Sequence, residues 1–295
     1  MRLGGIEMGG TKMVCAIVDE FGTILDRFVV PTTTPQETLD ELVNYFKGKN
    51  IDSLGIGSFG PIDLDKKSKT YGYITTTPKP GWANTDVLSP FKVLNVPIGF
   101  DTDVDAACVG EIYLGAGKGL DSVIYGTIGT GIGFGVYLEG KLIHGLMHTE
   151  AGHILLTKHE KDKDYIGPCP YHTNCFETLA SGPSIEKRWG KKAEYLYCND
   201  EVWELEAYYI GQALCDLIMC YSPKKIILGG GVMHNEKLLD LVRKETLKNL
   251  NGYIKRDEIL DNIDNFIVTP DLKDNAGIIG CAQLGRIALN DELSR

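Results

Sequence analysis

Short apolar runs alternate along the whole chain with stretches that have apolar residues at helical spacing. The short runs are rich in β-branched residues, which is typical of strands. The helical stretches repeat apolar residues every three or four positions, as Leu39, Leu42 and Phe46 do. Strands are predicted on both sides of glycine turns within 3–18 and 122–137, and at 22–30, 53–59, 96–100, 225–228 and 266–269. Helices are predicted at 35–47, 105–114, 203–221, 235–249 and 276–289. This alternation predicts an α/β fold.

The same order of strand, glycine turn and strand occurs in both halves of the chain. The first turn is Gly9-Gly10-Thr11-Lys12 and the second is Gly129-Thr130-Gly131. Glycine allows a tight turn with bare backbone N–H groups that can bind an anion, and threonine hydroxyls add donors. Two ordinary hairpins with glycine turns are the alternative. The pair of turns favours two halves that close on one polyphosphate.

Neither turn matches two common phosphate-binding motifs. A Walker A loop places Gly-Lys-Ser/Thr at the start of a helix, whereas Gly10-Thr11-Lys12 precedes a predicted strand. A dinucleotide-binding fingerprint also opens a helix, whereas the glycines of 129–135 alternate into a strand.

Length and charge narrow the class of protein. The 295 residues suffice for two domains, and the glycine-rich stretch 115–120 is the predicted boundary. A net charge of −10 without a basic cluster argues against nucleic-acid binding. No apolar run has the length of a membrane span, and the N-terminus lacks a signal-peptide pattern. We expect a cytoplasmic protein whose 8 cysteines are reduced or metal-bound.

Asp103 is the candidate general base. It follows a predicted strand and precedes a predicted helix, and ligands bind at such strand ends in open α/β sheets. A carboxylate there can accept the proton of an attacking hydroxyl. Helix capping is the alternative for Asp103, and Asp101 and Asp105 compete for either role.

A cluster of cysteine and histidine predicts a metal site. Cys169, His172 and Cys175 have C-x2-H-x2-C spacing, and His153 can supply a fourth ligand. Four nitrogen and sulfur ligands favour structural zinc, although two buried cysteines beside a chance histidine remain possible. Glu150, three residues before His153, can hydrogen-bond a polyhydroxy ligand together with it, or it is a surface residue beside a packed histidine.

A third glycine cluster, Gly229-Gly230-Gly231, follows a predicted strand and precedes a predicted helix. It allows a nucleoside to approach the backbone closely. A plain turn between a strand and a helix is the alternative.

Together these motifs resemble the ROK family of sugar kinases, within the actin/hexokinase-like superfamily. The resemblance covers nearly the whole chain. Residues 7–12 resemble the family's first phosphate loop, usually Asp-x-Gly-Gly-Thr-Lys, and 102–107 resemble Asn-Asp-Ala-Asn-Ala-Ala, whose Asp is the base. The other matching segments are 126–133 (second phosphate loop), 150–153 (sugar-and-zinc element) and 175–177 (end of the zinc knuckle).

Three further segments, 77–82, 169–172 and 180–190, resemble the fructokinase branch of that family. Two positions depart from the family pattern. Glu7 stands where most members have Asp, and Thr102 stands where an Asn often contacts the sugar.

The resemblance implies a two-lobed actin/hexokinase-like (ribonuclease H-like) α/β fold with a duplicated glycine-turn β-hairpin. Residues 1–114, completed by a helix within 274–295, would form the small lobe. Residues 115–273 would form the large lobe with the second phosphate loop, the zinc knuckle and the glycines on the nucleoside side.

The implied activity is ATP-dependent phosphorylation of fructose to fructose 6-phosphate, with Mg²⁺ on the nucleotide and a structural Zn²⁺. Asp103 would be the catalytic base. The sugar would be bound by Thr102, Glu150, His153 and Glu177. The nucleotide would be bound by Gly9, Gly10, Thr11, Lys12, Gly129, Thr130, Gly131, Gly230 and Gly231. The zinc ligands would be His153, Cys169, His172 and Cys175.

Two alternatives stay open, and the family also implies a homodimer. The substrate could instead be glucose, mannose or an N-acylated amino sugar. The chain could also be a catalytically silent sugar sensor that acts through a protein partner, although the base and both phosphate loops are present.

Overall fold

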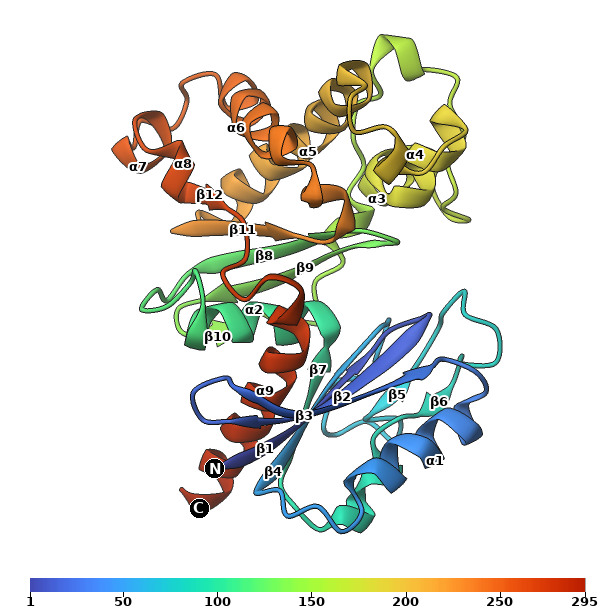
Figure 1. Cartoon of the computed structure of the whole chain (residues 1–295). Coiled ribbons are helices and arrows are strands. Elements are labelled where there is room, and N and C mark those ends of the chain that lie inside the picture. The colour runs from blue at the N-terminus through green and yellow to red at the C-terminus, as the bar shows by residue number, and fades with distance from the viewer. Residues whose placement is uncertain (295) are drawn as a thin grey trace.

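Two five-stranded sheets of the same strand order form the framework of the molecule (Figure 1). The structure is a computed structural model, and it describes residues 1–294. The first sheet has the order β3-β2-β1-β4-β7 and consists of β1 (Arg2–Met8), β2 (Lys12–Asp19), β3 (Ile24–Pro31), β4 (Ser53–Ser58) and β7 (Ile98–Thr102). The second has the order β10-β9-β8-β11-β12 and consists of β8 (Val123–Ile128), β9 (Ile132–Leu138), β10 (Lys141–Leu142), β11 (Lys225–Gly229) and β12 (Ile267–Val268). A small hairpin, β5 (Tyr73–Ile74) and β6 (Thr85–Asp86), accompanies the first sheet.

Each sheet is built around a glycine-turn hairpin. In the first, Met8 pairs with Met13 next to the turn, and in the second Ile128 pairs with Ile132. A parallel strand then joins the first strand of each hairpin, β4 beside β1 and β11 beside β8. The duplicated hairpin predicted from the sequence is thereby confirmed.

The helices divide into three groups around the sheets (Figure 1). Helix α1 (Pro35–Phe46) packs on the first-sheet half, whereas α2 (Asp103–Leu114) and α9 (Ala276–Leu293) lie between the halves. The remaining helices cover the second sheet and are α3 (Phe176–Ala180), α4 (Gly182–Trp189), α5 (Asp200–Tyr221), α6 (Glu236–Leu250), α7 (Asp257–Leu260) and α8 (Ile263–Phe266). Short 3-10 helices are η1 (Ser89–Leu94), η2 (Ala151–His153), η3 (Glu160–Asp162), η4 (Ala193–Tyr195), η5 (Gly231–His234) and η6 (Lys273–Asn275).

The last helix returns to the first sheet. α9 packs on β1, β4 and β7 and against α2, which itself packs on β8 and β9 of the second sheet. The approach is close enough to require glycine, because a Cβ at Gly55 would lie 1.6 Å from the carbonyl oxygen of Cys281. These two helices therefore connect the packing of both halves.

Several element boundaries differ from the prediction for identifiable reasons. Strand β7 begins at Ile98 rather than 96, since Pro97 has no N–H to give to a ladder. Helix α2 begins at Asp103 rather than 105, because the Thr102 side chain caps it. Residues 263–266 form a helical turn, which shortens the strand predicted at 266–269. Among residues 1–294, no helix combines the length and hydropathy needed to cross a membrane.

Candidate active site

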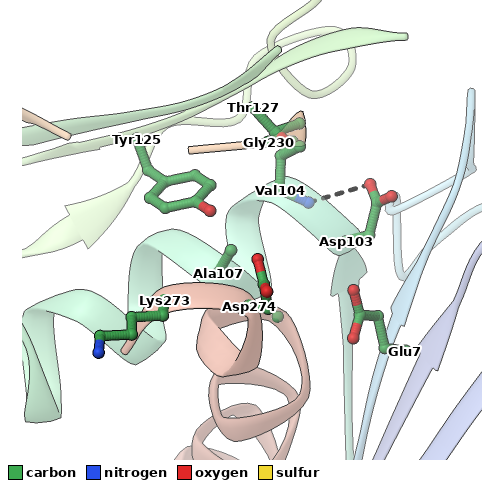
Figure 2. A pocket seen from close by; sticks show the side chains of 10 residues that line it. Glu7, Asp103, Val104, Ala107, Tyr125, Thr127, Gly230, Lys273 and Asp274 are labelled. Carbon is green, nitrogen blue, oxygen red and sulfur yellow. Dashed lines mark hydrogen bonds between the residues drawn. The ribbon is translucent and has the colours of Figure 1, made fainter. Parts of the chain in front are cut away.

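A cavity of about 190 Å³ lies where the two halves meet (Figure 2). The first half contributes Glu7 from β1 and Asp103 from α2, and the second contributes Tyr125 and Thr127 from β8. Lys273 and Asp274, just before α9, close another side. The cavity is therefore lined by carboxylates and polar groups from segments that are far apart in the sequence.

Asp103 is the first residue of α2, and it does not cap that helix. Thr102 is the cap, since its Oγ1 accepts the Asp105 N–H at 3.0 Å. The alternative assignment of Asp103 as a cap is therefore wrong. Oδ1 of Asp103 accepts the N–H of Val104 at 3.0 Å, and burial raises the Asp103 pKa to about 6. A carboxylate with this pKa is ionised at neutral pH and is basic enough to accept a proton.

Glu7 is the second carboxylate of the cavity. Burial, followed by the charge of Asp103, raises its pKa to about 7. The longer side chain of Glu has room because position 277 is glycine, where a Cβ would lie 2.6 Å from Oε1 of Glu7. Figure 2 shows both carboxylates on the same side of the cavity.

Each glycine turn is closed by a backbone hydrogen bond and has an exposed tip. Gly9 donates to the Lys12 carbonyl at 3.1 Å, and Gly129 donates to the Gly131 carbonyl at 2.9 Å. These bonds form the turns themselves. Gly10, Thr11 and Lys12 are exposed at the tip of the first turn, and Thr130 and Gly131 at the tip of the second.

A larger cavity, of about 700 Å³, extends from the second turn. Its walls include Gly129, Thr130 and Gly231, together with Pro183 of α4 and Tyr197. Gly230 has a φ of +91° and packs on the end of β8, where a Cβ would lie 2.4 Å from the Ile128 carbonyl oxygen. The third glycine cluster thus borders the same space as the second turn.

Two further carboxylates lie on the second-sheet half. Oε2 of Glu177 accepts the N–H of Ile132 at 3.0 Å, which ties the start of α3 to the second glycine turn. Glu150 lies 3.4 Å from Nδ1 of His148. Burial, and then the charges of Glu177, Asp103 and Asp105, raise the Glu150 pKa to about 7. The charges of these acidic groups therefore act on Glu150.

Thr102 is oriented into its own helix. Its hydroxyl donates to Oδ2 of Asp105 at 2.9 Å besides accepting the Asp105 N–H, and the residue is only 4% exposed. The cap occupies the hydroxyl proton and one lone pair. A sugar contact by Thr102 stays a prediction.

The four predicted metal ligands come together. One donor atom from each of His153, Cys169, His172 and Cys175 lies within 4.8 Å of every other. Sγ of Cys169 is 3.7 Å from Nδ1 of His172 and 4.0 Å from Nδ1 of His153. Two thiols and two imidazoles fit a tetrahedral zinc ion.

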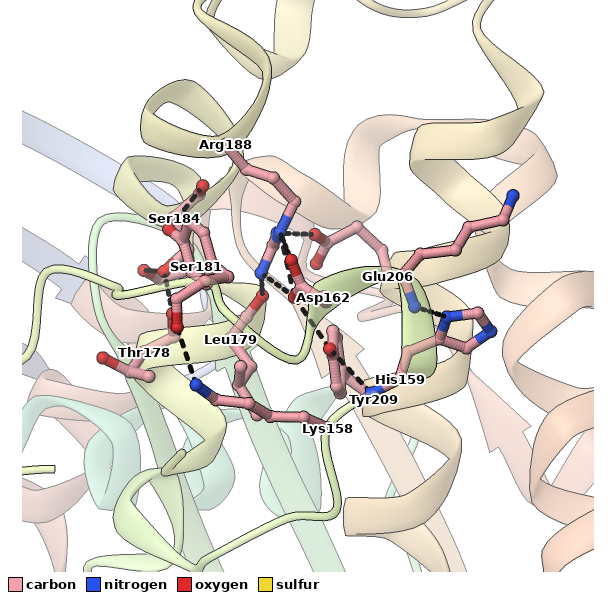
Figure 3. A network of polar contacts seen from close by, with 12 residues as sticks. Lys158, His159, Asp162, Thr178, Leu179, Ser181, Ser184, Arg188, Glu206 and Tyr209 are labelled. Carbon is pink, nitrogen blue, oxygen red and sulfur yellow. Dashed lines mark hydrogen bonds and ion pairs between the residues drawn. The ribbon is translucent and has the colours of Figure 1, made fainter. Parts of the chain in front are cut away.

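A buried ion network lies in the second-sheet half (Figure 3). Arg188 of α4 pairs with Asp162 at 2.9 Å and with Glu206 of α5 at 3.3 Å. It also donates to the Leu179 carbonyl at 2.7 Å, and Tyr209 donates to Asp162 at 2.7 Å. The network joins α3, α4 and α5 to the segment that leads into the knuckle.

Some residues of the site escaped the sequence prediction. Tyr125, Lys273 and Asp274 line the cavity but were not among the predicted site residues, although Tyr125 lies in a predicted strand of the second hairpin. His144 was also missed. Its Nε2 lies 3.1 Å from Oδ1 of Asp101, a contact between residues 43 positions apart.

Two sheets of equal strand order, each built around a glycine-turn hairpin, with a carboxylate-lined cavity where the two halves meet, define a two-lobed phosphotransferase fold of the hexokinase-like class. A family model described as the ROK family matches residues 3–287. The chain therefore belongs to the ROK family, and the resemblance seen in the sequence is confirmed.

Individual relatives refine this assignment. A fructokinase of Streptococcus mutans serotype c (strain ATCC 700610 / UA159) is 45% identical over 99% of this chain and 98% of its own. The ROK hexokinase structure of Thermus thermophilus has a TM-score of 0.80 and 25% identity over 99% of this chain and 100% of that chain. A ROK glucokinase of Streptomyces griseus, solved with glucose and AMPPNP, has a TM-score of 0.77 and 26% identity over 97% and 100%. The identity is higher to the fructokinase, which agrees with the predicted branch.

Proposed function

We propose that this protein is a fructokinase that transfers the γ-phosphoryl group of ATP to the 6-hydroxyl of fructose. The position of Asp103 carries the assignment to phosphoryl transfer. Its carboxylate lines a cavity together with Glu7, two residues before the first glycine turn, and Thr127, two residues before the second. The choice of fructose rests on the 45% identity to a fructokinase, against 25% and 26% to the ROK hexokinase and glucokinase.

In this proposal Asp103 accepts the proton of the sugar hydroxyl as that hydroxyl attacks the γ-phosphorus. Phosphoryl transfer needs little covalent help from a protein, so positioning and charge stabilisation dominate. The N–H groups at the tips of both turns would hold phosphate oxygens, and Lys12 would add positive charge. The nucleoside would occupy the larger cavity beside Gly230 and Gly231.

Metal ions would assist in two places. Glu7 offers an oxygen ligand of the kind that Mg²⁺ prefers, and Mg²⁺ bound with ATP neutralises phosphate charge. His153, Cys169, His172 and Cys175 would hold a structural zinc with all four positions filled by protein. That site would fix η2, which follows Glu150, and the start of α3, which carries Glu177.

The sugar would be oriented by Glu150, His153 and Glu177. All three lie on the second-sheet half, whereas Asp103 belongs to the first. A homodimer, the cytoplasmic location, and the division into lobes 1–114 with 274–295 and 115–273 stay part of the proposal. Light scattering of the purified protein tests the dimer.

Identification of the product tests the proposed function. Incubation with fructose and ATP·Mg²⁺ is followed by ³¹P NMR, which distinguishes phosphate on the 6-hydroxyl from phosphate on the 1-hydroxyl. We expect one fructose 6-phosphate for each ADP formed. A phosphate on another hydroxyl, or ADP with inorganic phosphate alone, contradicts the proposal.

A further inference from the structure

The loop that leads from β10 to Glu150 reaches across to the first-sheet half and contacts it twice. Nε2 of His144 lies 3.1 Å from Oδ1 of Asp101 and 3.5 Å from Oδ2 of Asp105. Nε2 of His148 accepts the N–H of Ile62 at 3.1 Å. The same loop then continues to Glu150.

We propose that His144 is a positioning residue that holds the Glu150 loop against the strand end and helix start that carry Asp103. It would thereby set the separation between the sugar-binding carboxylate and the base. This inference rests on the proposed function, in which those two groups act on one sugar.

His144 contacts one residue before Asp103 in the sequence and one residue after it. Asp101 lies two residues before Asp103, near the end of β7, and Asp105 lies two residues after it, in the first turn of α2. Oδ1 of Asp101 also accepts the N–H of Thr102 at 2.9 Å, and Thr102 bonds to Asp105. One imidazole therefore fixes both sides of the strand-to-helix junction.

The loop has little else to hold it between its two contacts. Gly145, Leu146 and Met147 separate His144 from His148 and are all exposed. Leu146 is as accessible as in an open chain, at 103%. Hydrophobic packing thus contributes little to this stretch, and Gly145 donates to the Met147 carbonyl at 3.1 Å within it. Within residues 1–294, the polar contacts from 144–148 to the first-sheet half are those of His144 and His148.

Charge supports the same role. Asp101 and Asp105 are 6% and 2% exposed, and burying two carboxylates side by side is costly without a cation. The hydrogen bonds to Asp101 and Asp105 raise the His144 pKa to about 10, so the imidazole is charged at neutral pH. The groups that face it are Asp101 of β7, Asp105 of α2, and His148 of its own loop.

Loss of this cation has a predictable effect on the base. Asp105 already contributes to the raised pKa of Asp103 through its charge. Burial, followed by the charge of Asp101, raises the Asp105 pKa to about 7, and the hydrogen bond to His144 lowers it. A neutral side chain at position 144 removes one positive charge from the surroundings of the base, and the pKa of Asp103 rises. A role limited to stability would leave the pH dependence of the reaction unchanged.

The test compares His144→Gln, which keeps a donor but no charge, with His144→Leu, which keeps neither. His159→Gln, a histidine on the second-sheet half outside the site, is the matched control. We expect the KM for fructose to rise about tenfold or more in His144→Leu, while the KM for ATP changes less than threefold. In both variants the acid limb of kcat/KM should move to higher pH, and the control should match the wild type.

Hydrogen exchange supplies a readout that does not depend on the substrate. Amides of 143–150 should exchange faster in His144→Leu than in the wild type or the control. A wild-type protein that turns over no fructose contradicts the proposed function, and exchange then still tests the contact. If His144→Leu does not fold, the pH profile of His144→Gln decides. Wild-type exchange in His144→Leu, or a wild-type pH profile in His144→Gln, overturns the inference.

Discussion

Carboxylates with raised pKa values define the site at the residue scale. Asp103 and Glu7 are displaced to about 6 and about 7 mainly by burial, and Glu150 to about 7 for the same reason. Asp103 and Glu7 line one cavity, and carboxylates whose pKa values lie near neutrality are typical of acid and base chemistry. Asp103 is distinguished from Glu7 and Glu150 by its place as the first residue of α2, directly after β7.

Removing the basicity of Asp103 tests its role. Asp103→Asn keeps the size of the side chain and its position at the start of α2. We expect kcat to fall by about 10²–10⁴, the usual contribution of a positioned base. Calorimetry should show fructose binding within about threefold of wild type. Near-normal turnover in this variant would show that Asp103 is not the base.

The pKa of Asp103 also predicts a pH profile. The base must be deprotonated, and its pKa is raised to about 6, so kcat/KM should rise with pH up to about 6 and level off above it. Initial rates with subsaturating fructose between pH 4.5 and 8 measure this limb. An acid limb near pH 4, the ordinary value for Asp, would contradict the assignment.

At the scale of elements, two clusters of contacts hold the segment that carries the proposed sugar-binding groups. The Cys and His knuckle ties η2 to the start of α3, and the Arg188 network ties α3, α4 and α5 together (Figure 3). Burial raises the pKa of Glu206 to about 8, so Asp162 is the main counter-charge of Arg188 at neutral pH.

The knuckle predicts one zinc per chain. Elemental analysis of purified protein should find about one equivalent, and Cys175→Ser should lose most of it. The Tm should fall by several degrees, since one kcal/mol corresponds to about 2–4 °C in chains approaching this size. Cys198→Ser replaces an exposed cysteine outside the cluster and should change neither value. Wild-type protein without zinc would end this part of the account.

The Arg188 network predicts a large stability effect. Arg188→Met leaves the buried Asp162 carboxylate without its cationic partner. The loss of one partner of a buried ion pair lowers the free energy of unfolding by about 3–5 kcal/mol. Urea unfolding measures it. Arg256→Met, which removes an exposed ion pair with Glu258, should have little effect. Equal midpoints for both variants would show that the network does not stabilise the fold.

At the scale of the molecule, α2 and α9 connect the packing of the two sheets (Figure 1). The 143–150 loop contacts the first-sheet half through His144 and His148. Groups on the two halves can act on one substrate only when the halves keep a fixed position relative to each other. The position of Asp103 relative to Glu150 is therefore a property of the whole chain rather than of either half.

Local patterns determined how much of this could be predicted from the sequence. The two hairpins were predictable because β-branched alternation and glycine turns are local, and the knuckle because its ligands lie close in sequence. The start of α2 depended on a side-chain cap, and the contact of His144 with Asp101 depended on topology. Long-range contacts of that kind leave no trace in residue spacing.

Relative turnover of sugars tests the central claim most directly. Initial rates of ADP formation with ATP·Mg²⁺ give kcat/KM for fructose, glucose, mannose and N-acetylmannosamine under one set of conditions. The proposed fructokinase activity predicts that kcat/KM for fructose exceeds kcat/KM for each of the other sugars by at least about tenfold. This ratio corresponds to about 1.4 kcal/mol of transition-state discrimination. A higher value for another sugar, or no turnover of any of them, would contradict it.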